Sequence, residues 1–358
     1  MILETYKVVA EEKLVELAAK FNITPEEIKR LNPNTRFFKA FFGPEYVAAL
    51  QHIQVPVREI VSNKDILTDK KVLDNLTFDQ EARYRCEQTV ITKINGITQN
   101  HANTKTEFLI GKQATQEGLF VKVQMIDNIL QMQPAQLGET ITLLNGVENV
   151  KSDATFMINP HTGKIIKVMN HNEIIEKWRK HKEYLNAKYD FIRLEQNRES
   201  YNQFMILAGN QIVQEDKLII DLESKLFYQL FFDKYLVTNK DLFASYRRPF
   251  YSQLFTGTKL GLDFKQDILS EYEDGIVVRK VGTINPDSYD DEELEEMYNR
   301  KFKPLIKYQF SEFSFSYRER SVINTKDRWI ESAEVTMIEQ VKNNIQILVE
   351  YKLKKIDI

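Results

Sequence analysis

"YQFSEFSFSYRER" spans residues 308–320, and "IQILVEYKL" spans residues 345–353. In the first stretch Phe313, Phe315 and Tyr317 alternate with polar residues, and apolar residues alternate in the same way along the second. Successive side chains of a β-strand point to opposite faces, so this period predicts strands with one buried face and one wet face. One wet face is typical of antiparallel sheets, and we therefore predict antiparallel sheets here.

The rest of the body has a strand, helix, strand order. "TFMINPHTGKIIKV" at 155–168 has two short apolar runs around a turn, which predicts a hairpin. We predict strands over 81–168, mainly helix over 171–240 and strands again over 275–354. This order indicates an α+β fold with antiparallel sheets and a central helical segment. Curved sheets of this kind can hold apolar ligands, although the sequence itself shows no cavity.

Length and composition indicate more than one domain. The chain has 358 residues, which exceeds the roughly 100–200 residues of a usual single domain. We predict a small domain over 1–58, a connector over 59–80 and a body over 81–358. With 42% apolar and 28% charged residues the chain is expected to be globular. A net charge of -3 gives no field that favours nucleic acid, so no nucleic-acid partner is expected.

Targeting signals are not evident in the sequence. Glu4, Lys7, Glu11, Glu12 and Lys13 interrupt the early apolar residues, so no signal peptide is predicted. No run of eighteen apolar residues occurs, and no transmembrane span is expected. We expect a cytoplasmic protein, or one that a dedicated export machine loads without a cleaved signal.

The first 57 residues have their own pattern of short elements. Tyr6 and Val8 alternate with polar neighbours, as in a short strand. Apolar residues then recur at helical spacing, at Leu14, Leu17, Ala18 and Phe21. Thr24 and Pro25 form a typical helix start, and the segment 53–56 is a plausible closing strand. The order predicts a βααβ unit.

This pattern resembles a LysM domain over residues 4–57. The matching residues are Tyr6, Val8, Leu14, Leu17, Ala18, Phe21, Ile23, Ile28, Leu31, Asn32, Pro33, Ile53, Val55 and Pro56. The resemblance implies a βααβ fold that binds N-acetylglucosamine glycans, such as peptidoglycan or chitin, between its first and last loops. LysM-like domains also occur in contractile injection machines, where they dock proteins.

Both loops of the groove depart from the LysM pattern. Glu11, Glu12 and Lys13 replace the usual Gly-Asp-Thr, so long charged side chains crowd the place where a glycine permits close approach. The second loop is rich in aromatic residues, at Phe37, Phe38, Phe41, Phe42 and Tyr46. These rings either pack back on the body or anchor a protein partner, because aromatic residues carry much interface energy.

Motifs for chemistry are missing from the sequence. No phosphate-binding glycine loop and no His-Glu-x-x-His pair occurs, and Cys86 is best explained as an apolar filler in a strand. The acidic segment 286–301 lacks the glycine and ligand spacing of a calcium loop, and predicts instead a solvent-facing helix that begins at Ser288 or Asp290. We expect a non-enzymatic protein without a cofactor or a metal site.

Two classes of function remain open at this stage. The first is an adaptor whose LysM-like domain docks a protein partner, such as an injection-machine or toxin subunit of a contractile, type VI secretion-like system. The alternative is a glycan-binding protein of the bacterial cell envelope. An enzyme tethered to the cell wall is a third and weaker hypothesis.

Overall fold

The computed structural model describes residues 3–8, 12–14, 17–18, 25–33, 35, 37–39, 45–47, 51–56, 63–133, 138–189, 195–238 and 244–357. The chain divides into two compact units, Met1–Thr68 and Asp69–Ile358. Helix α3 (Asn63–Asp74) runs across this division. Each unit is described by itself below.

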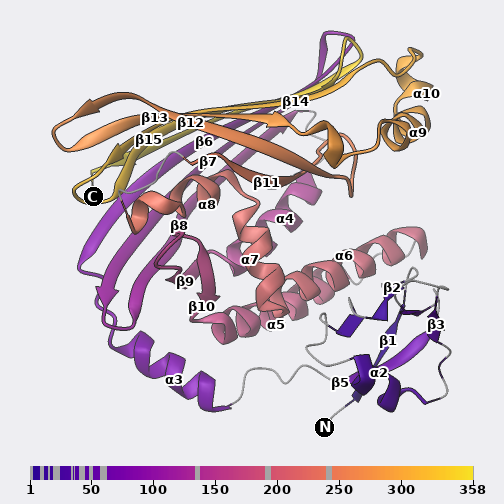
Figure 1. Cartoon of the computed structure of the whole chain (residues 1–358), viewed down its shortest axis with the longest axis horizontal. Helices are drawn as coiled ribbons and strands as arrows, with labels where there is room; N and C mark the ends of the chain where they lie inside the picture. The colour runs from indigo at the N-terminus through magenta and orange to yellow at the C-terminus, as the bar shows by residue number, and fades with distance from the viewer. Residues whose placement is uncertain are drawn as a thin grey trace. The chain divides into compact units, whose positions relative to one another are not determined.

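A single antiparallel sheet forms most of the second unit. In the described part of this unit the sheet has eleven strands in the order β10-β9-β8-β7-β6-β16-β15-β14-β13-β12-β11. The bounds are β6 Gln80–Ile94, β7 Ile97–Thr115, β8 Gly118–Gln133, β9 Asp153–Ile158, β10 Ile165–Val168, β11 Tyr246–Tyr251, β12 Lys259–Tyr272, β13 Gly275–Ile284, β14 Phe313–Asn324, β15 Trp329–Val341 and β16 Ile345–Ile356. Figure 1 shows that this sheet curves strongly.

The predicted α+β fold class is wrong, because the strands before and after the helical segment belong to one sheet. Strand β16 pairs with β6 from Ile345↔Ile94 to Ile356↔Arg83, across most of the chain's length. Alternation shows that a segment is a strand, but it does not show which distant strand it pairs with. The two predicted groups of strands were therefore separated although they share a ladder.

Alternation and turn residues explain the local form of the sheet. Strand β14 buries every second residue, including Phe313, Phe315 and Tyr317, as predicted. The hairpin predicted at 155–168 is present as β9 and β10. Gly163 in its turn has φ +72°, a conformation that favours glycine.

The described helices of the second unit pack mainly on one face of the sheet. They are α4 Gly138–Val150, α5 His171–Lys188, α6 Glu195–Val213, α7 Glu215–Glu223, α8 Leu226–Phe231, α9 Asp291–Lys301 and α10 Lys303–Ile306. Helices α7 and α8 lie within the curve of the sheet (Figure 1). All residues of α8 are buried, which fits its mainly apolar sequence LFYQLF. No helix in the described ranges is long and apolar enough to cross a membrane.

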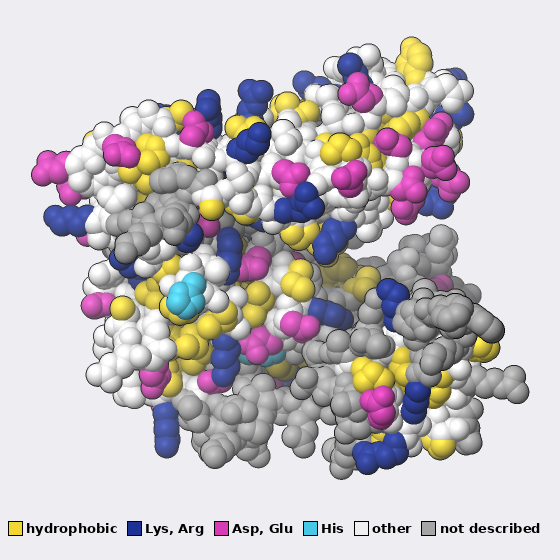
Figure 2. All heavy atoms as spheres, viewed as in Figure 1, with side chains coloured by type: hydrophobic (Ala, Val, Ile, Leu, Met, Phe, Trp, Pro, Cys, Tyr) yellow, Lys and Arg dark blue, Asp and Glu magenta, His cyan; other side chains and the backbone are white. Residues whose placement is uncertain are grey.

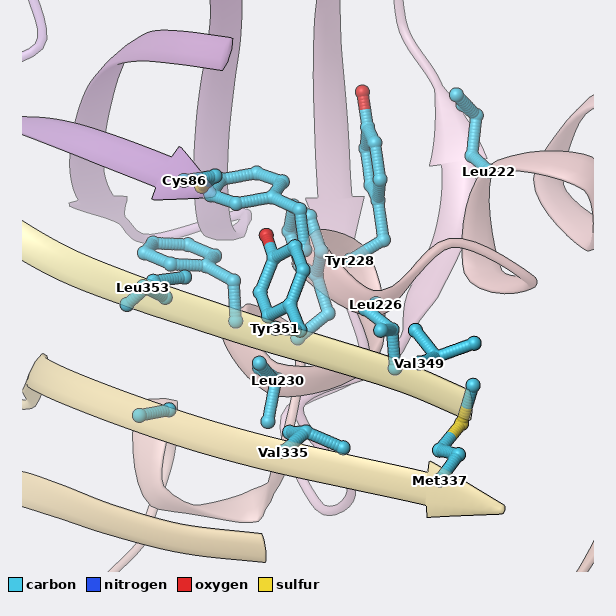
Figure 3. Packing of buried hydrophobic residues seen from close by; sticks show 14 of the residues in the cluster. Cys86, Leu222, Leu226, Tyr228, Leu230, Val335, Met337, Val349, Tyr351 and Leu353 are labelled. Atoms are coloured by element: carbon cyan, nitrogen blue, oxygen red, sulfur yellow. The ribbon is translucent and has the colours of Figure 1, made fainter. Parts of the chain in front are cut away.

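Aromatic side chains form the centre of this core. Tyr84 of β6 meets Phe231 of α8 edge to face, with ring centroids 5.6 Å apart. Phe227 stacks on Phe108 of β7 at 4.0 Å. Figure 3 shows Val335 and Met337 of β15 and Val349, Tyr351 and Leu353 of β16, with Leu226, Tyr228 and Leu230 of α8 packed near them. Helix α8 is thus held by rings and branched side chains from both halves of the sheet.

The acidic segment forms the helix predicted for it. Helix α9 has Asp290 as its N-cap, and the Asp290 carboxylate accepts a hydrogen bond from the Glu292 backbone N–H at 2.9 Å. Acidic residues fill its first turn, where the helix dipole favours them. Figure 2 shows acidic side chains gathered on the surface over this helix. The segment is therefore a capped surface helix.

The first unit is not the predicted βααβ domain. Strand β1 (Leu3–Lys7) pairs with β5 (His52–Pro56), and helix α2 is Pro25–Leu31. A three-stranded sheet is also present, made of β2 Glu12–Lys13, β3 Phe37–Lys39 and β4 Glu45–Val47 in the order β2-β4-β3. The prediction failed because the segments of this sheet were assigned to loops. Strands of two or three residues are too short to show a period.

Candidate functional site

A cavity of about 1050 Å³ is lined by the curved sheet, including its edge strand β11, and by helix α8. Its floor is apolar and buried, formed by Val278, Ile323, Met337 and Val349 of four neighbouring strands. Met337 and Val349 are partners in the β15–β16 ladder and project toward the side on which α8 carries Leu226 (Figure 3). The volume lies at the upper end of the range of about 300–1,000 Å³ that is common for ligand pockets.

A cluster of paired charged side chains lies next to this apolar floor. The Lys280 ammonium of β13 lies 2.6 Å from Oδ2 of Asp233 and 3.3 Å from Oε1 of Glu319. Glu319 also accepts hydrogen bonds from the Tyr317 hydroxyl at 2.8 Å and the Ser321 hydroxyl at 2.7 Å. The other Asp233 oxygen accepts from the Lys234 backbone N–H at 2.8 Å. All four carboxylate oxygens are therefore occupied.

The ionisation of this group is fixed by the charges that face one another. Burial raises the pKa of Asp233, but the ammonium groups of Lys280 and Lys164 outweigh it and hold that pKa well below its usual value. Burial lowers the pKa of Lys280, but Asp233 and Glu319 outweigh it and raise that pKa well above its usual value. Asp233 and Lys280 remain charged because they are paired.

Lys164 and Arg248 are two of the further cations that border the cavity. Lys164 follows the tight turn at Gly163, and its ammonium donates to the Phe232 carbonyl at 2.5 Å. Burial lowers the pKa of Lys164, an effect that Asp233 opposes. Arg248 lies on β11 with its guanidinium over the Phe250 ring, 5.2 Å from the centroid. These two residues with Asp233, Lys280 and Glu319 form what we call the cavity charge group, which has three cations and two anions.

Some polar atoms in the cavity wall have no hydrogen-bond partner among the residues that the structure describes. They are Nη2 of Arg248, the hydroxyl of Tyr235 and Oε1 of Gln229, all of them buried atoms. Burial raises the pKa of Tyr235 well above its usual value, so its hydroxyl keeps its proton and can donate. A buried polar group without a partner costs free energy, so these atoms mark a place where a ligand could bond.

Sequence reasoning missed the cavity charge group. A signal was present: the period that buries Phe313 and Tyr317 on β14 also places Glu319 on the buried face. In the same way, Val278 and Lys280 share the inner face of β13. A charged residue at a core position of an alternating strand indicates a buried partner or a site. Asp233 and Arg248 could not be assigned to this group, because their segments show no comparable pattern.

The structure brings together several of the residues singled out in the first unit. Lys13 of β2 and Phe38 of β3 both face Tyr46 of β4 in the ladders of the three-stranded sheet. Phe38 is 52% exposed, whereas Phe37 is half-buried against the small core of this unit. Glu12 also lies in β2. The remaining residues of the predicted loops, Glu11, Phe41 and Phe42, lie outside the described residues.

Groups suited to nucleophilic or metal chemistry are not brought together in the described part of the chain. Cys86 is buried in β6, as predicted, and burial raises the pKa of its thiol to about 12. No cluster of three or more metal-ligating side chains occurs among the described residues. Among the described residues, the histidines therefore do not join other side chains in a metal site.

Comparisons with known proteins give one structural likeness to report. No protein-family model matches the chain, and no curated protein matches it in sequence. The chain is similar to a solved structure titled "lipid-protein interactions in lipovitellin", with a TM-score of 0.37 and 10% identity. The match covers 77% of this chain and 25% of that chain, so this chain spans about a quarter of its length. No catalytic family is indicated.

Proposed function

We propose that this chain is a non-enzymatic binding protein whose body holds an elongated apolar ligand inside the curved sheet. The observation that carries the proposal is the cavity of about 1050 Å³ with a buried apolar floor. The cavity is partly open to solvent, and ligand sites are typically concave, mostly apolar clefts of this kind. A space of this size lined by Val278, Met337 and Val349 is therefore more consistent with a binding site than with a packing defect.

The direction of the cavity favours an elongated ligand. Its lining residues come from seven neighbouring strands, in the order β6, β16, β15, β14, β13, β12 and β11. Neighbouring strands lie ~4.8 Å apart, so the lining extends for roughly 30 Å along the sheet. A chain-like apolar molecule laid across the strands would bury its length on this floor.

A neutral fluorescent probe tests this proposal. The full chain should bind 1-N-phenylnaphthylamine at a single saturable site, with a rise in emission as the probe leaves water. Val349→Phe places a ring into the cavity and should weaken binding about tenfold or more. The volume-conserving change Met337→Leu should leave binding within about twofold, because such swaps cost little. Unchanged binding by a folded Val349→Phe protein would refute the cavity as the binding site.

A second proposed function concerns the first unit. We propose that it docks a protein partner, consistent with the LysM-like proteins of contractile injection machines, and that it does not bind glycan strongly. Supporting this are the exposed ring of Phe38 and the pairing of Lys13 with Tyr46, which put an aromatic and a charged residue on one small sheet. The glycine that LysM domains carry beside the glycan is replaced by Glu11 in this sequence.

Two assays separate docking from glycan binding. Phe38→Ser should weaken capture of a native partner roughly thirtyfold, since truncation of a central aromatic anchor costs about 2 kcal/mol or more. Phe37→Ser is the matched control, because Phe37 packs on the core and its loss should lower stability instead. Retention of the full chain on insoluble peptidoglycan or chitin, independent of Phe38, would favour the glycan-binding alternative.

A further inference from the structure

We propose that the charged end of the cavity binds the anionic head group of a single-chain amphiphile, with Arg248 and Tyr235 as the hydrogen-bond donors. This inference rests on the proposed apolar-ligand function and names the class of ligand. The shared chemistry is an anionic oxygen group, a carboxylate or a phosphate, attached to an apolar chain.

Unused donors carry the first step. Nη2 of Arg248 and the hydroxyl of Tyr235 are buried atoms in the cavity wall without a hydrogen-bond partner among the described residues. Tyr235 is only 3% exposed. A guanidinium nitrogen can only donate, so the missing partner of Arg248 must be an acceptor. Hydrogen bonds from arginine to anionic oxygens are among the strongest that proteins make.

Charge balance carries the second step. The charged residues that line the cavity are seven Lys or Arg side chains, Lys164, Arg248 and Lys280 among them, and two acidic ones, Asp233 and Glu223. Both oxygens of Asp233 and both oxygens of Glu319 are already bound by other groups. Neither carboxylate forms an ion pair with Arg248 in the described part of the chain. An incoming anion would reduce the excess of positive charge and could accept from the unpartnered Nη2 of Arg248.

The apolar floor carries the third step, because it distinguishes an amphiphile from a small free anion. Val278 and Lys280 lie on the same inner face of β13, so the buried charge and the apolar floor adjoin. A head group at Arg248 would place its chain over the floor formed by Ile323, Met337 and Val349. Arg248 lies on β11 at the edge of the sheet and the apolar floor lies on β13 to β16, so a donor is at one end of the lining and apolar surface extends from it.

Three probes of equal chain length test the inference on the full chain: oleate, oleoyl lysophosphatidic acid and oleyl alcohol. Each displaces 1-N-phenylnaphthylamine, and its dissociation constant is compared among wild type, Arg248→Gln, Tyr235→Phe and Arg279→Gln. Arg279 is the matched control, because it is exposed on β13 and paired with Asp267. Circular dichroism and thermal melting establish that each variant is folded.

At least one anionic probe should bind wild type about tenfold or more tightly than the alcohol, the expected gain from a charge-assisted hydrogen bond. Arg248→Gln should remove that preference while the alcohol binds unchanged, and Tyr235→Phe should reduce it by a smaller factor. Arg279→Gln should preserve it. Which anion gains more identifies the head group.

The inference is overturned if the alcohol binds as tightly as both anions, or if folded Arg248→Gln keeps the preference; the proposed apolar-ligand function would survive either result. If none of the three probes binds, the inference and the proposed function both fail. Inorganic phosphate is tested in the same displacement assay. If it displaces the probe as effectively as the lysophosphatidic acid does, the site binds free anions and the inference is also overturned.

Discussion

Two ion groups in the second unit differ in how completely their charges are paired. The helix clamp consists of Glu148 and Lys151 at the end of α4 with Asp221 and Lys225 near α7. Lys151 lies 2.6 Å from Asp221 and 2.7 Å from Glu148, while Lys225 pairs with the same two carboxylates. Two cations meet two anions, and all four are paired.

The cavity charge group has one cation more than anions, and Nη2 of its Arg248 has no partner in the described part of the chain. A balanced and fully bonded group serves to join elements, whereas a surplus of charge beside a cavity leaves capacity for a ligand. The difference indicates that a buried charge alone does not identify a binding site. A hydrogen-bond donor without a partner beside a cavity is the more specific indication.

The largest expected effect comes from removal of the central cation of the cavity charge group. Lys280→Met leaves Asp233 and Glu319 buried without their common partner, and should lower the free energy of unfolding by about 3–5 kcal/mol. Chemical denaturation measures this change. Arg279→Met is the control on the neighbouring, exposed position and should leave stability almost unchanged, because exposed ion pairs contribute little. Equal effects at the two positions would contradict the buried pairing.

The turn that supports Lys164 provides the next effect. A Cβ at Gly163 would overlap the backbone carbonyl of Asp233, and the backbone there has φ +72°. Gly163→Ala should therefore cost about 2–4 kcal/mol, from the unfavourable φ together with overpacking. Gly96→Ala is the matched control, because Gly96 has φ +76° but nothing within 4 Å of a Cβ. It should cost only about 1–2 kcal/mol. A smaller loss at Gly163 than at Gly96 would show that the close approach to Asp233 is wrong.

The helix clamp should be less sensitive than the cavity charge group. Lys151→Met leaves Glu148 and Asp221 with Lys225 as a remaining partner, and these carboxylates are partly exposed. We expect a loss of about 1–3 kcal/mol, measured in the same denaturation series. A loss equal to that of Lys280→Met would erase the distinction between the two groups.

Lowering the pH should weaken both ion groups. Of the changes considered, it should alter the difference between the two groups the least. The pKa values of Glu148 and Asp221 are raised by burial but lowered more strongly by Lys225 and Lys151, and their net shift, like that of Asp233, is downward. A carboxyl with a lowered folded pKa contributes stability above its unfolded value of about 4, and that stability is lost as the pH falls below it.

Unfolding free energies measured between pH 7 and pH 3 should therefore decline in wild type. The decline should be shallower in Lys280→Met, since Asp233 then loses the ammonium that lowers its pKa. Glu339 acts in the opposite sense, because burial raises its pKa. A steeper decline in the Lys280 variant would contradict the assignment.

The sequence predicted local structure better than it predicted assembly. The period of Phe313, Phe315 and Tyr317 predicted β14, and a helix start at Ser288 or Asp290 was predicted for α9, whose N-cap is Asp290, because these signals lie within a few residues. The pairing of β6 with β16 joins segments from opposite ends of the body, and no local pattern encodes it. The predicted fold class failed at that pairing.

The candidate site followed the same rule. Glu319 was discoverable as a charge at a core position of an alternating strand. Asp233 meets Lys280, and Arg248 borders the same cavity, only because a curved sheet encloses helix α8 and its following turn. The cavity forms because the sheet encloses the helix. The hydrophobic periodicity along the sequence does not describe such an enclosure.

The position of a bound apolar chain is the most direct test of the account. Full-length protein should be irradiated with oleate that carries a diazirine in the middle of its chain, and the labelled residues should be mapped by mass spectrometry. We expect labels on the cavity floor and its cover, at Val278, Met337, Val349 and Leu226. Labelling confined to the exposed apolar residues of α6, Ile206 and Leu207, would show surface adsorption and would contradict the cavity as the ligand site.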